Sequence, residues 1–168
     1  MELVLTNLLL IVLGGCLGSF ASLLIYRLPL EDIKINILKP RSFCPQCKTQ
    51  LGIIQLIPFL GYLYNRGACF ACNAKINHLY LINELIIAAF ILFIFNKLAL
   101  ANLSSWLIVF IVFGLYIQAI IDLQTLHLFQ PISIILIVSG LMLNVSIGFF
   151  TVPLDSFLGL VFGYGILF

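Results

Sequence analysis

The sequence predicts an all-α membrane protein, a polytopic helix bundle, and its composition is the first reason. Of its 168 residues, 63% are hydrophobic and only 8% are charged, whereas soluble domains average about 45–50% and about 25%. A soluble globule of this length could not cover its surface with eight cations and six acids. Intrinsic disorder is excluded as well, because it requires low hydrophobicity and high charge. The chain is therefore expected to lie in a bilayer, with membrane lipid as a partner.

Five apolar stretches predict the helices, and four of them are long enough to be full spans. A helix rises ~1.5 Å per residue, so crossing the ~30 Å hydrocarbon core takes roughly 20 residues. The full-length stretches are residues 3–26, 79–95, 103–121 and 132–150. The fifth stretch, residues 156–168, has 13 residues and is predicted as a partial span. The sequence is therefore expected to be the front part of a longer protein.

The basic residues predict how the chain is oriented. Seven of the eight Lys and Arg lie between Arg27 and Lys75. By the positive-inside rule, the loop that holds them is cytoplasmic and the N-terminus is outside. We therefore expect a first transmembrane helix at residues 1–26, a cytoplasmic loop at 27–78 and the remaining transmembrane helices at 79–168. The cations form no dense patch, so no nucleic acid is expected as a partner.

The cysteines of this loop form a metal-binding pattern. Two C-x-x-C pairs are separated by 21 residues: Cys44 with Cys47, and Cys69 with Cys72. Each turn can direct two sulfurs at one centre, and two turns complete a tetrahedral zinc site, as in zinc ribbons. Lys48 and Asn73, which follow the pairs, suit tight knuckle turns. Disulfides and free thiols are the alternatives, and a reducing cytoplasm disfavours disulfides. We predict a structural Zn²⁺, because four thiolates leave no open coordination position.

Two ionisable residues fall inside predicted spans, where charges are costly and by default indicate function. They are Glu84, five residues into the second span, and Asp122, at the inner end of the third. Gln118 lies one helical turn before Asp122 on the same face and can hydrogen-bond it. The structural alternatives are an interfacial helix-capping role for Asp122 and a pairing of Glu84 with a loop Lys or Arg.

Small residues recur in the first predicted helix. Gly14, Gly18 and Ser22 are spaced four residues apart. In membrane helices such spacing forms a face on which a neighbouring helix can pack closely.

Three stretches carry more specific motifs. Residues 18–29 read GSFASLLIYRLP, residues 74–84 after the second cysteine pair read AKINHLYLINE, and Asp122 lies between Ile121 and Leu123. In this order and spacing they resemble, over nearly the whole chain, the bacterial prepilin peptidases. These membrane aspartic proteases process type IV prepilins and pseudopilins. The family's opening motif is G-S-F-x-N-V-x-I-x-R-x-P, in which Ser22 replaces the usual Asn.

The resemblance implies an aspartic-type endopeptidase, a hydrolase of type IV pilus and type II secretion systems in the bacterial cytoplasmic (inner) membrane. Such an enzyme cleaves the leader peptide of a prepilin or pseudopilin. It often also acts as a methyltransferase that methylates the new N-terminus with S-adenosylmethionine, for which no binding residue is assigned here. Asp122 matches one of the family's two catalytic aspartates.

The family's second catalytic aspartate lies in a later G-x-G-D motif. Here Gly163-Tyr164-Gly165 is followed by Ile166, so the sequence is expected to be truncated before that aspartate and inactive alone. Two other interpretations stay open. One is a non-enzymatic zinc-binding membrane adaptor or a decayed remnant, and the other is a transporter fragment with Glu84 and Asp122 as proton carriers.

Overall fold

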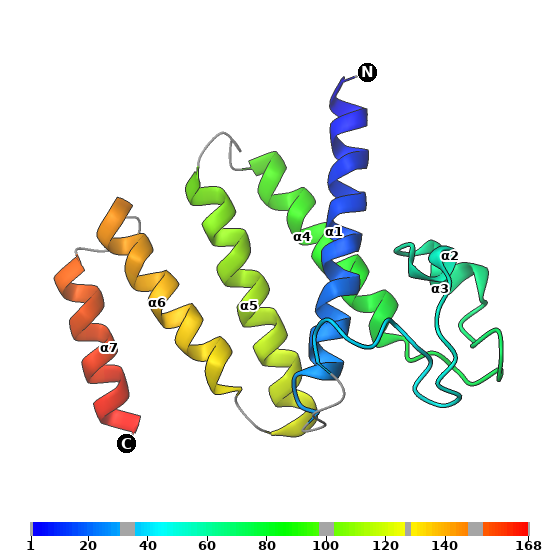
Figure 1. Ribbon diagram of the computed structural model, residues 1–168. Coiled ribbons are helices and arrows are strands. Elements are labelled where there is room, and N and C mark those ends of the chain that lie inside the picture. The colour runs from blue at the N-terminus through cyan, green and yellow to red at the C-terminus, as the bar shows by residue number, and fades with distance from the viewer. Residues whose placement is uncertain (1, 31–35, 98–102, 127–128, 148–152, 168) are drawn as a thin grey trace. The chain divides into compact units, whose positions relative to one another are not determined.

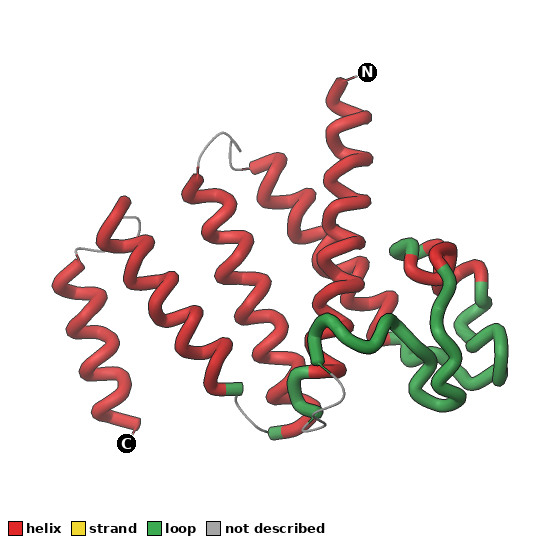
Figure 2. The backbone as a smooth tube through the Cα atoms, in the orientation of Figure 1, coloured by secondary structure: helices red, strands yellow, loops and turns green. Residues whose placement is uncertain are grey.

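The computed structural model describes residues 2–30, 36–97, 103–126, 129–147 and 153–167, and in these ranges it is built of helices and loops (Figures 1 and 2). The helices are α1 (Glu2–Arg27), α2 (Ile53–Leu56), α3 (Leu60–Tyr64), α4 (Leu79–Lys97), α5 (Leu103–Thr125), α6 (Gln130–Ile147) and α7 (Pro153–Leu167). The described residues contain isolated β-bridges but no strand. The predicted all-α membrane class is therefore confirmed.

Three of these helices are long and apolar enough to cross a membrane: Glu2–Arg27, Leu79–Lys97 and Trp106–Thr125. Two shorter apolar helices, Gln130–Met142 and Leu154–Gly163, follow in the described part of the chain. The chain forms two compact units, residues 1–98 and residues 99–168. We describe each of them by itself.

Helices α1 and α4 form the core of the first unit, and small residues let their backbones approach. A Cβ atom at Gly14 would overlap the backbone of Ala88, and one at Gly18 would overlap the backbone of Glu84. One turn further along α1, the buried Asn83 amide donates a 2.9 Å hydrogen bond to the Ser22 hydroxyl. The packing face predicted from the four-residue spacing is therefore confirmed.

The loop between α1 and α4 folds back along α1. Its two short helices, α2 and α3, are joined by Ile57, Pro58 and Phe59, and Figure 1 shows them beside α1. A Cβ atom at Gly15 would lie only 2.7 Å from Cε2 of Phe59 and 2.8 Å from Cβ of Pro58. The absence of a side chain at Gly15 therefore makes room for the α2–α3 turn.

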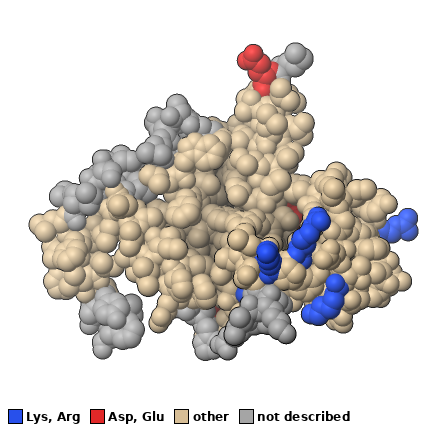
Figure 3. All heavy atoms as spheres, viewed as in Figure 1, with Lys and Arg blue, Asp and Glu red and all other residues tan. Residues whose placement is uncertain are grey.

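Charged side chains gather on the same loop. In the view of Figure 3, Lys and Arg atoms lie over the surface that the loop of the first unit forms. Arg27, at the end of α1, is itself buried. Its guanidinium donates to the carbonyls of Asn36 at 2.7 Å, Ile37 at 3.2 Å and Pro40 at 2.7 Å. This cation ties the start of the loop to the helix end.

The second unit is built from α5, α6 and α7. A Cβ atom at Gly114 of α5 would lie 2.8 Å from Cδ2 of Leu136 on α6. The side-chain amide of Asn144 on α6 donates a 2.7 Å hydrogen bond to the hydroxyl of Ser156 on α7. Because the three helices alternate in direction, Asp122 near the end of α5 and Asp155 at the start of α7 lie at opposite ends of this unit (Figure 1).

Candidate functional site

The two cysteine pairs have the same backbone fold. In the first, the N–H of Cys44 donates to the carbonyl of Thr49 at 2.9 Å, and the N–H of Lys48 donates to the carbonyl of Cys44 at 2.9 Å. In the second, the N–H of Cys69 donates to the carbonyl of Ala74 at 2.8 Å, and the N–H of Asn73 donates to the carbonyl of Cys69 at 2.9 Å. Each C-x-x-C segment is thus one closed knuckle.

The residues after the two pairs complete these turns. Lys48 has φ 58° and Asn73 has φ 55°, and both lie in the left-handed region, which Asn tolerates better than most residues. The prediction that these two positions form tight knuckle turns is therefore confirmed.

The four thiols meet at one point of the first unit. The sulfur atoms of Cys44, Cys47, Cys69 and Cys72 all lie within 4.8 Å of one another. The sulfurs of Cys44 and Cys72 are 3.9 Å apart, as are those of Cys47 and Cys69. A disulfide requires about 2.05 Å, whereas four sulfurs at ~2.3 Å from a tetrahedral zinc lie about 3.8 Å apart. The cluster therefore fits a zinc ion and excludes disulfides between these partners.

The knuckle backbone favours the thiolate form of two of these residues. Hydrogen bonds with the side chain and backbone of Thr49 lower the pKa of the Cys47 thiol to about 6. Backbone hydrogen bonds from Ala71 and Cys72 lower the pKa of the Cys69 thiol. At Cys72 a backbone hydrogen bond from Ala74 acts in the same direction, but burial and the neighbouring thiols outweigh it and raise the pKa to about 11. Four adjacent thiolates repel one another, so a bound cation would let all of them ionise.

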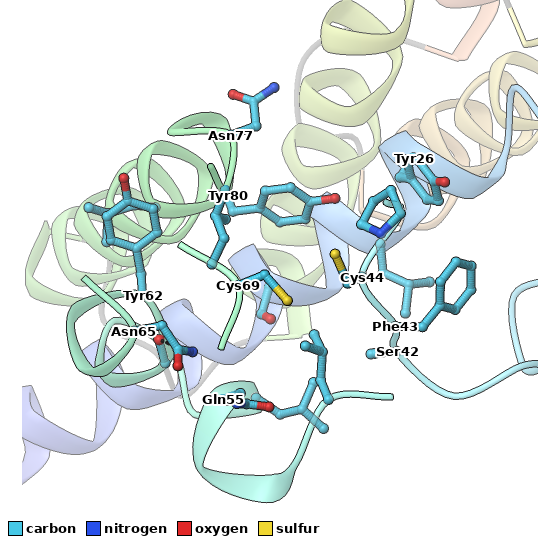
Figure 4. A pocket seen from close by; sticks show the side chains of 18 of the residues that line it. Tyr26, Ser42, Phe43, Cys44, Gln55, Tyr62, Asn65, Cys69, Asn77 and Tyr80 are labelled. Atoms are coloured by element: carbon cyan, nitrogen blue, oxygen red, sulfur yellow. Dashed lines mark hydrogen bonds between the residues drawn. The ribbon is translucent and has the colours of Figure 1, made fainter. Parts of the chain in front are cut away.

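A cavity lies beside this cluster, entirely within the first unit. It has a volume of about 600 Å³ and is bounded by α1, the start of α4 and both knuckles. Figure 4 shows Tyr26, Tyr62 and Tyr80 around it, together with the thiols of Cys44 and Cys69. Its size is that of a small-molecule site, for which about 300–1,000 Å³ is usual. Sequence reasoning missed this cavity, because its lining residues come from segments far apart in the chain.

Glu84 has a different partner from the one that the sequence suggested. Within the described residues its carboxylate accepts a 2.7 Å hydrogen bond from the backbone N–H of Phe59, and it is not paired with a Lys or Arg there. The expected ion pair with a loop cation is therefore not found among the described residues, and Lys34 of the loop lies outside them. A carboxylate can stabilise a turn by accepting a backbone N–H, and Phe59 is such a turn residue, with φ 62°.

Asp122 lies in the second unit, near the end of α5. Its carbonyl accepts a 2.7 Å hydrogen bond from the N–H of Leu126, which has φ 55° and ends the helix. Its side chain is half-buried. Asp122 belongs to the second unit, whereas the four cysteines belong to the first.

Gln118 does not hydrogen-bond Asp122, contrary to the expectation from their spacing. Its side chain is buried, with 7% of its surface exposed. Neither its Nε2 nor its Oε1 atom has a hydrogen-bond partner among the described residues. A shared helical face places two residues near each other, but here the amide is buried in the packing while the Asp122 side chain stays partly open.

Comparison with known proteins identifies the family. Residues 12–98 match the family described as Bacterial Peptidase A24 N-terminal domain. The "Prepilin leader peptidase/N-methyltransferase" of Klebsiella pneumoniae is 35% identical, over 90% of this chain and 67% of the relative. The proteins of that name from Neisseria gonorrhoeae and Pectobacterium carotovorum subsp. carotovorum are 33% and 28% identical, over 91% of this chain in each case.

The chain spans 60% and 61% of the length of the Neisseria and Pectobacterium relatives. No solved structure matches it. The matches extend from the cysteine-containing unit into the unit that carries Asp122. They show that this chain belongs to the bacterial A24 peptidases, the family of the prepilin leader peptidase/N-methyltransferases.

Proposed function

We propose that the chain supplies one half of the active site of an aspartic-type endopeptidase that removes the leader peptide of type IV prepilins and pseudopilins. Asp122 is the catalytic residue that we assign. The observation that supports this assignment is the buried Gln118 amide one turn away, which has no hydrogen-bond partner among the described residues. A buried polar group without a partner costs about 1–3 kcal/mol. Such a cost is expected where a site is built to receive another polar group.

Peptide hydrolysis by this class of enzyme needs two carboxyls that share one proton. Two adjacent carboxyls cannot both ionise, so one stays protonated and polarises the scissile carbonyl while the other takes a proton from water. Asp155 lies at the opposite end of the second unit and cannot be the partner of Asp122. Glu84 already accepts a hydrogen bond from the Phe59 amide. We propose that the second carboxyl comes from outside these 168 residues.

The cysteine cluster has a structural role in this proposal. A zinc ion on Cys44, Cys47, Cys69 and Cys72 would be fully coordinated, so it would hold the two knuckles together without contacting substrate. Zinc would supply the cross-link that the segment lacks, because its knuckles are joined only by short helices and turns.

The cavity beside the knuckles is the site that we propose for S-adenosylmethionine, which would supply the methyl group for the new N-terminus. Tyr26 and Tyr80 line the cavity, and aromatic rings can bind a sulfonium cation over their faces. The names of the relatives support this second activity. We place it in the first unit because the matched N-terminal domain covers residues 12–98.

One assay can test both activities. We would fuse residues 1–168 to the remaining C-terminal part of the Klebsiella pneumoniae relative and supply a prepilin in membranes with labelled S-adenosylmethionine. Asp122→Asn should reduce cleavage by about a thousandfold or more, as loss of one member of a catalytic pair does. Asp155→Asn is the matched control and should cleave normally. Tyr80→Ala should cut methyl transfer and leave cleavage intact, whereas Tyr64→Ala, which lies outside the cavity lining, should change neither.

The adaptor hypothesis makes the opposite forecast for this assay. If Asp122 only ends a helix, the fusion carrying Asp122→Asn will cleave as fast as the parent. Equal expression and equal membrane insertion of the two fusions must be shown first. Cleavage that survives Asp122→Asn and is lost in Asp155→Asn would mean that the catalytic aspartate was misassigned.

A further inference from the structure

The segment between the two knuckles has an unusual composition for a loop. From Thr49 to Asn65 it carries no charged residue, and Lys48 and Arg66 stand directly at its ends. Its apolar side chains are not gathered into a core. Seven large hydrophobic residues of this segment are exposed: Ile53, Ile54, Leu56, Ile57, Leu60, Leu63 and Tyr64. Exposure of so large an apolar surface to water would favour aggregation, and such patches usually indicate an interaction surface.

The contacts of this segment fix its depth along the helices. The close contact between Gly14 and Ala88 joins the thirteenth of the 26 residues of α1 to the tenth of the 19 residues of α4. This contact therefore marks the middle of both apolar helices. The turn between α2 and α3 packs at the next residue, since Pro58 and Phe59 lie against Gly15. If α1 and α4 span the bilayer, the turn lies close to its midplane, about 18 Å from Arg27 along α1.

At that depth, every backbone polar group needs an internal partner, because lipid offers none. Most of the turn provides its own bonds: Ile57 N–H donates to Ile54 at 3.4 Å and Gly61 N–H donates to Ile57 at 2.8 Å. The amide of Phe59 lies at the tip, where the backbone is left-handed with φ 62°. This amide is satisfied by the Glu84 carboxylate of α4. This hydrogen bond explains why an ionisable residue, Glu84, lies inside a span: it accepts the backbone N–H at the tip of the turn.

We propose that residues 51–65 form a re-entrant hairpin that enters the bilayer from the side of the cysteine knuckles, and that Glu84 anchors its tip. The exposed apolar residues of the hairpin that do not line the cavity contact lipid acyl chains: Ile53, Ile54, Leu60, Leu63 and Tyr64. Lipid is the occupant that the structure favours, because this face is continuous in depth with the exposed residues Ile11, Val12 and Leu13 of α1. Lys48 and Arg66 then lie at the interface, where cations are stable. The proposal does not depend on the peptidase activity.

The hairpin changes the expectation drawn from the cation count. Residues 27–78 were predicted to be wholly cytoplasmic, but under this proposal only the two knuckles and their flanks are in water. A segment can re-enter the membrane without changing the side on which its flanking cations lie. The predicted orientation of the spans is therefore kept, and only the environment of the α2–α3 segment differs.

Depth-dependent fluorescence quenching tests the hairpin in the full chain. Trp106 is the single tryptophan, so a Trp106→Phe background permits one new probe at a time. Leu60, beside the tip, and Phe70, in the second knuckle, are each 56% exposed. In phosphatidylcholine vesicles, Leu60→Trp should be quenched severalfold more by lipids brominated on the acyl chain than by aqueous iodide. Phe70→Trp, the matched control, should show the reverse order.

Two results would overturn the proposal. Quenching of Leu60→Trp by iodide and not by brominated lipid would place the hairpin in water. Shielding of this probe from both quenchers would mean that protein covers the face, either a second copy of the chain or another partner.

The anchor is tested separately with two substitutions in the same Leu60→Trp chain. Glu84→Gln keeps an oxygen that can accept the Phe59 amide, so the quenching pattern should not change. Glu84→Leu leaves that amide without a partner, so iodide quenching should rise severalfold as the tip leaves the membrane. If both substitutions leave the probe equally shielded from iodide, Glu84 does not anchor the tip. A Glu84→Leu chain that fails to insert is recognised by loss of brominated-lipid quenching of the native Trp106 in a chain without the probe.

Discussion

The two compact units use the same kinds of residue in different ways. In the first unit, Gly14 and Gly18 face the backbone of α4, and the buried Asn83 amide is paired with Ser22. In the second unit, Gly114 meets only the side chain of Leu136, Gly140 and Gly159 have nothing within 4 Å of the position of a Cβ, and the buried Gln118 amide has no described partner. A glycine in an apolar helix therefore does not by itself predict close packing. A packing face is identified only when spaced glycines meet the backbone of a second helix, as Gly14 and Gly18 meet that of α4.

The largest expected effect in this comparison is the loss of the metal from the first unit. The double substitution Cys69→Ser and Cys72→Ser removes half of the four-sulfur set, and structural zinc sites of this kind contribute apparent binding energies of about 10–16 kcal/mol. We expect one zinc per chain in the parent protein and none in the variant. We also expect rapid proteolysis after Arg66 and Lys75 in the variant. Elemental analysis and limited proteolysis of the purified protein provide the measurements.

Cys16→Ser is the matched control for this experiment, since Cys16 lies in α1 and outside the cluster. It should keep its zinc and its resistance to protease. Equal zinc content in the parent and the double variant would show that the cysteine cluster holds no structural metal.

The second expected effect concerns the helix contacts. Gly18→Leu places a side chain where α4 leaves no room, and overpacking of a filled interior costs about 1–3 kcal/mol or more. Gly140→Leu adds the same side chain to a position with open space around it, so its cost should be near zero. Unfolding of both variants by sodium dodecyl sulfate in mixed micelles measures the difference. An equal loss of stability would mean that the glycines of the two units do not differ.

Much of this architecture could be predicted from the sequence because its signals are local. The apolar stretch at residues 79–95 becomes α4 (Leu79–Lys97), and the stretch at 103–121 becomes α5 (Leu103–Thr125). The boundaries differ because a helix can continue into polar residues such as Asp122 after the apolar pattern has ended. The two C-x-x-C pairs predicted the four-sulfur cluster because each knuckle closes within six residues, as the bond from Cys44 to Thr49 shows.

The interactions that sequence reasoning missed all depend on the folded chain. The bond between the Phe59 amide and Glu84 joins residues 25 positions apart, and nothing in the local sequence marks an aromatic residue for a positive φ. In the sequence, Arg27 counts only as one of the cations that predict the membrane orientation. In the structure, its guanidinium is buried and donates hydrogen bonds to three carbonyls. Gln118 and Asp122 show the opposite case, because their four-residue spacing predicted a hydrogen bond that the structure does not contain.

The smallest expected effect compares one Asn–Ser pair from each unit. Asn83 and Ser22 are 61 residues apart and buried, and their bond is 2.9 Å long. Asn144 and Ser156 are 12 residues apart and only partly buried, with a bond of 2.7 Å. Hydrogen bonds between membrane helices contribute on average about 0.6 kcal/mol and at most about 1.7 kcal/mol. If burial decides the strength, the longer bond should show the larger coupling energy.

A double-mutant cycle isolates each of these bonds. Asn83→Ala and Ser22→Ala, alone and together, give the coupling energy of the first pair, and Asn144→Ala with Ser156→Ala gives that of the second. We expect about 1 kcal/mol for the first and a few tenths of a kcal/mol for the second, because water competes for a partly exposed bond. The cycle removes contributions that each asparagine makes elsewhere, which matters because both have further partners. A larger coupling for Asn144 with Ser156 would mean that bond length, and not burial, decides the strength of polar contacts between these helices.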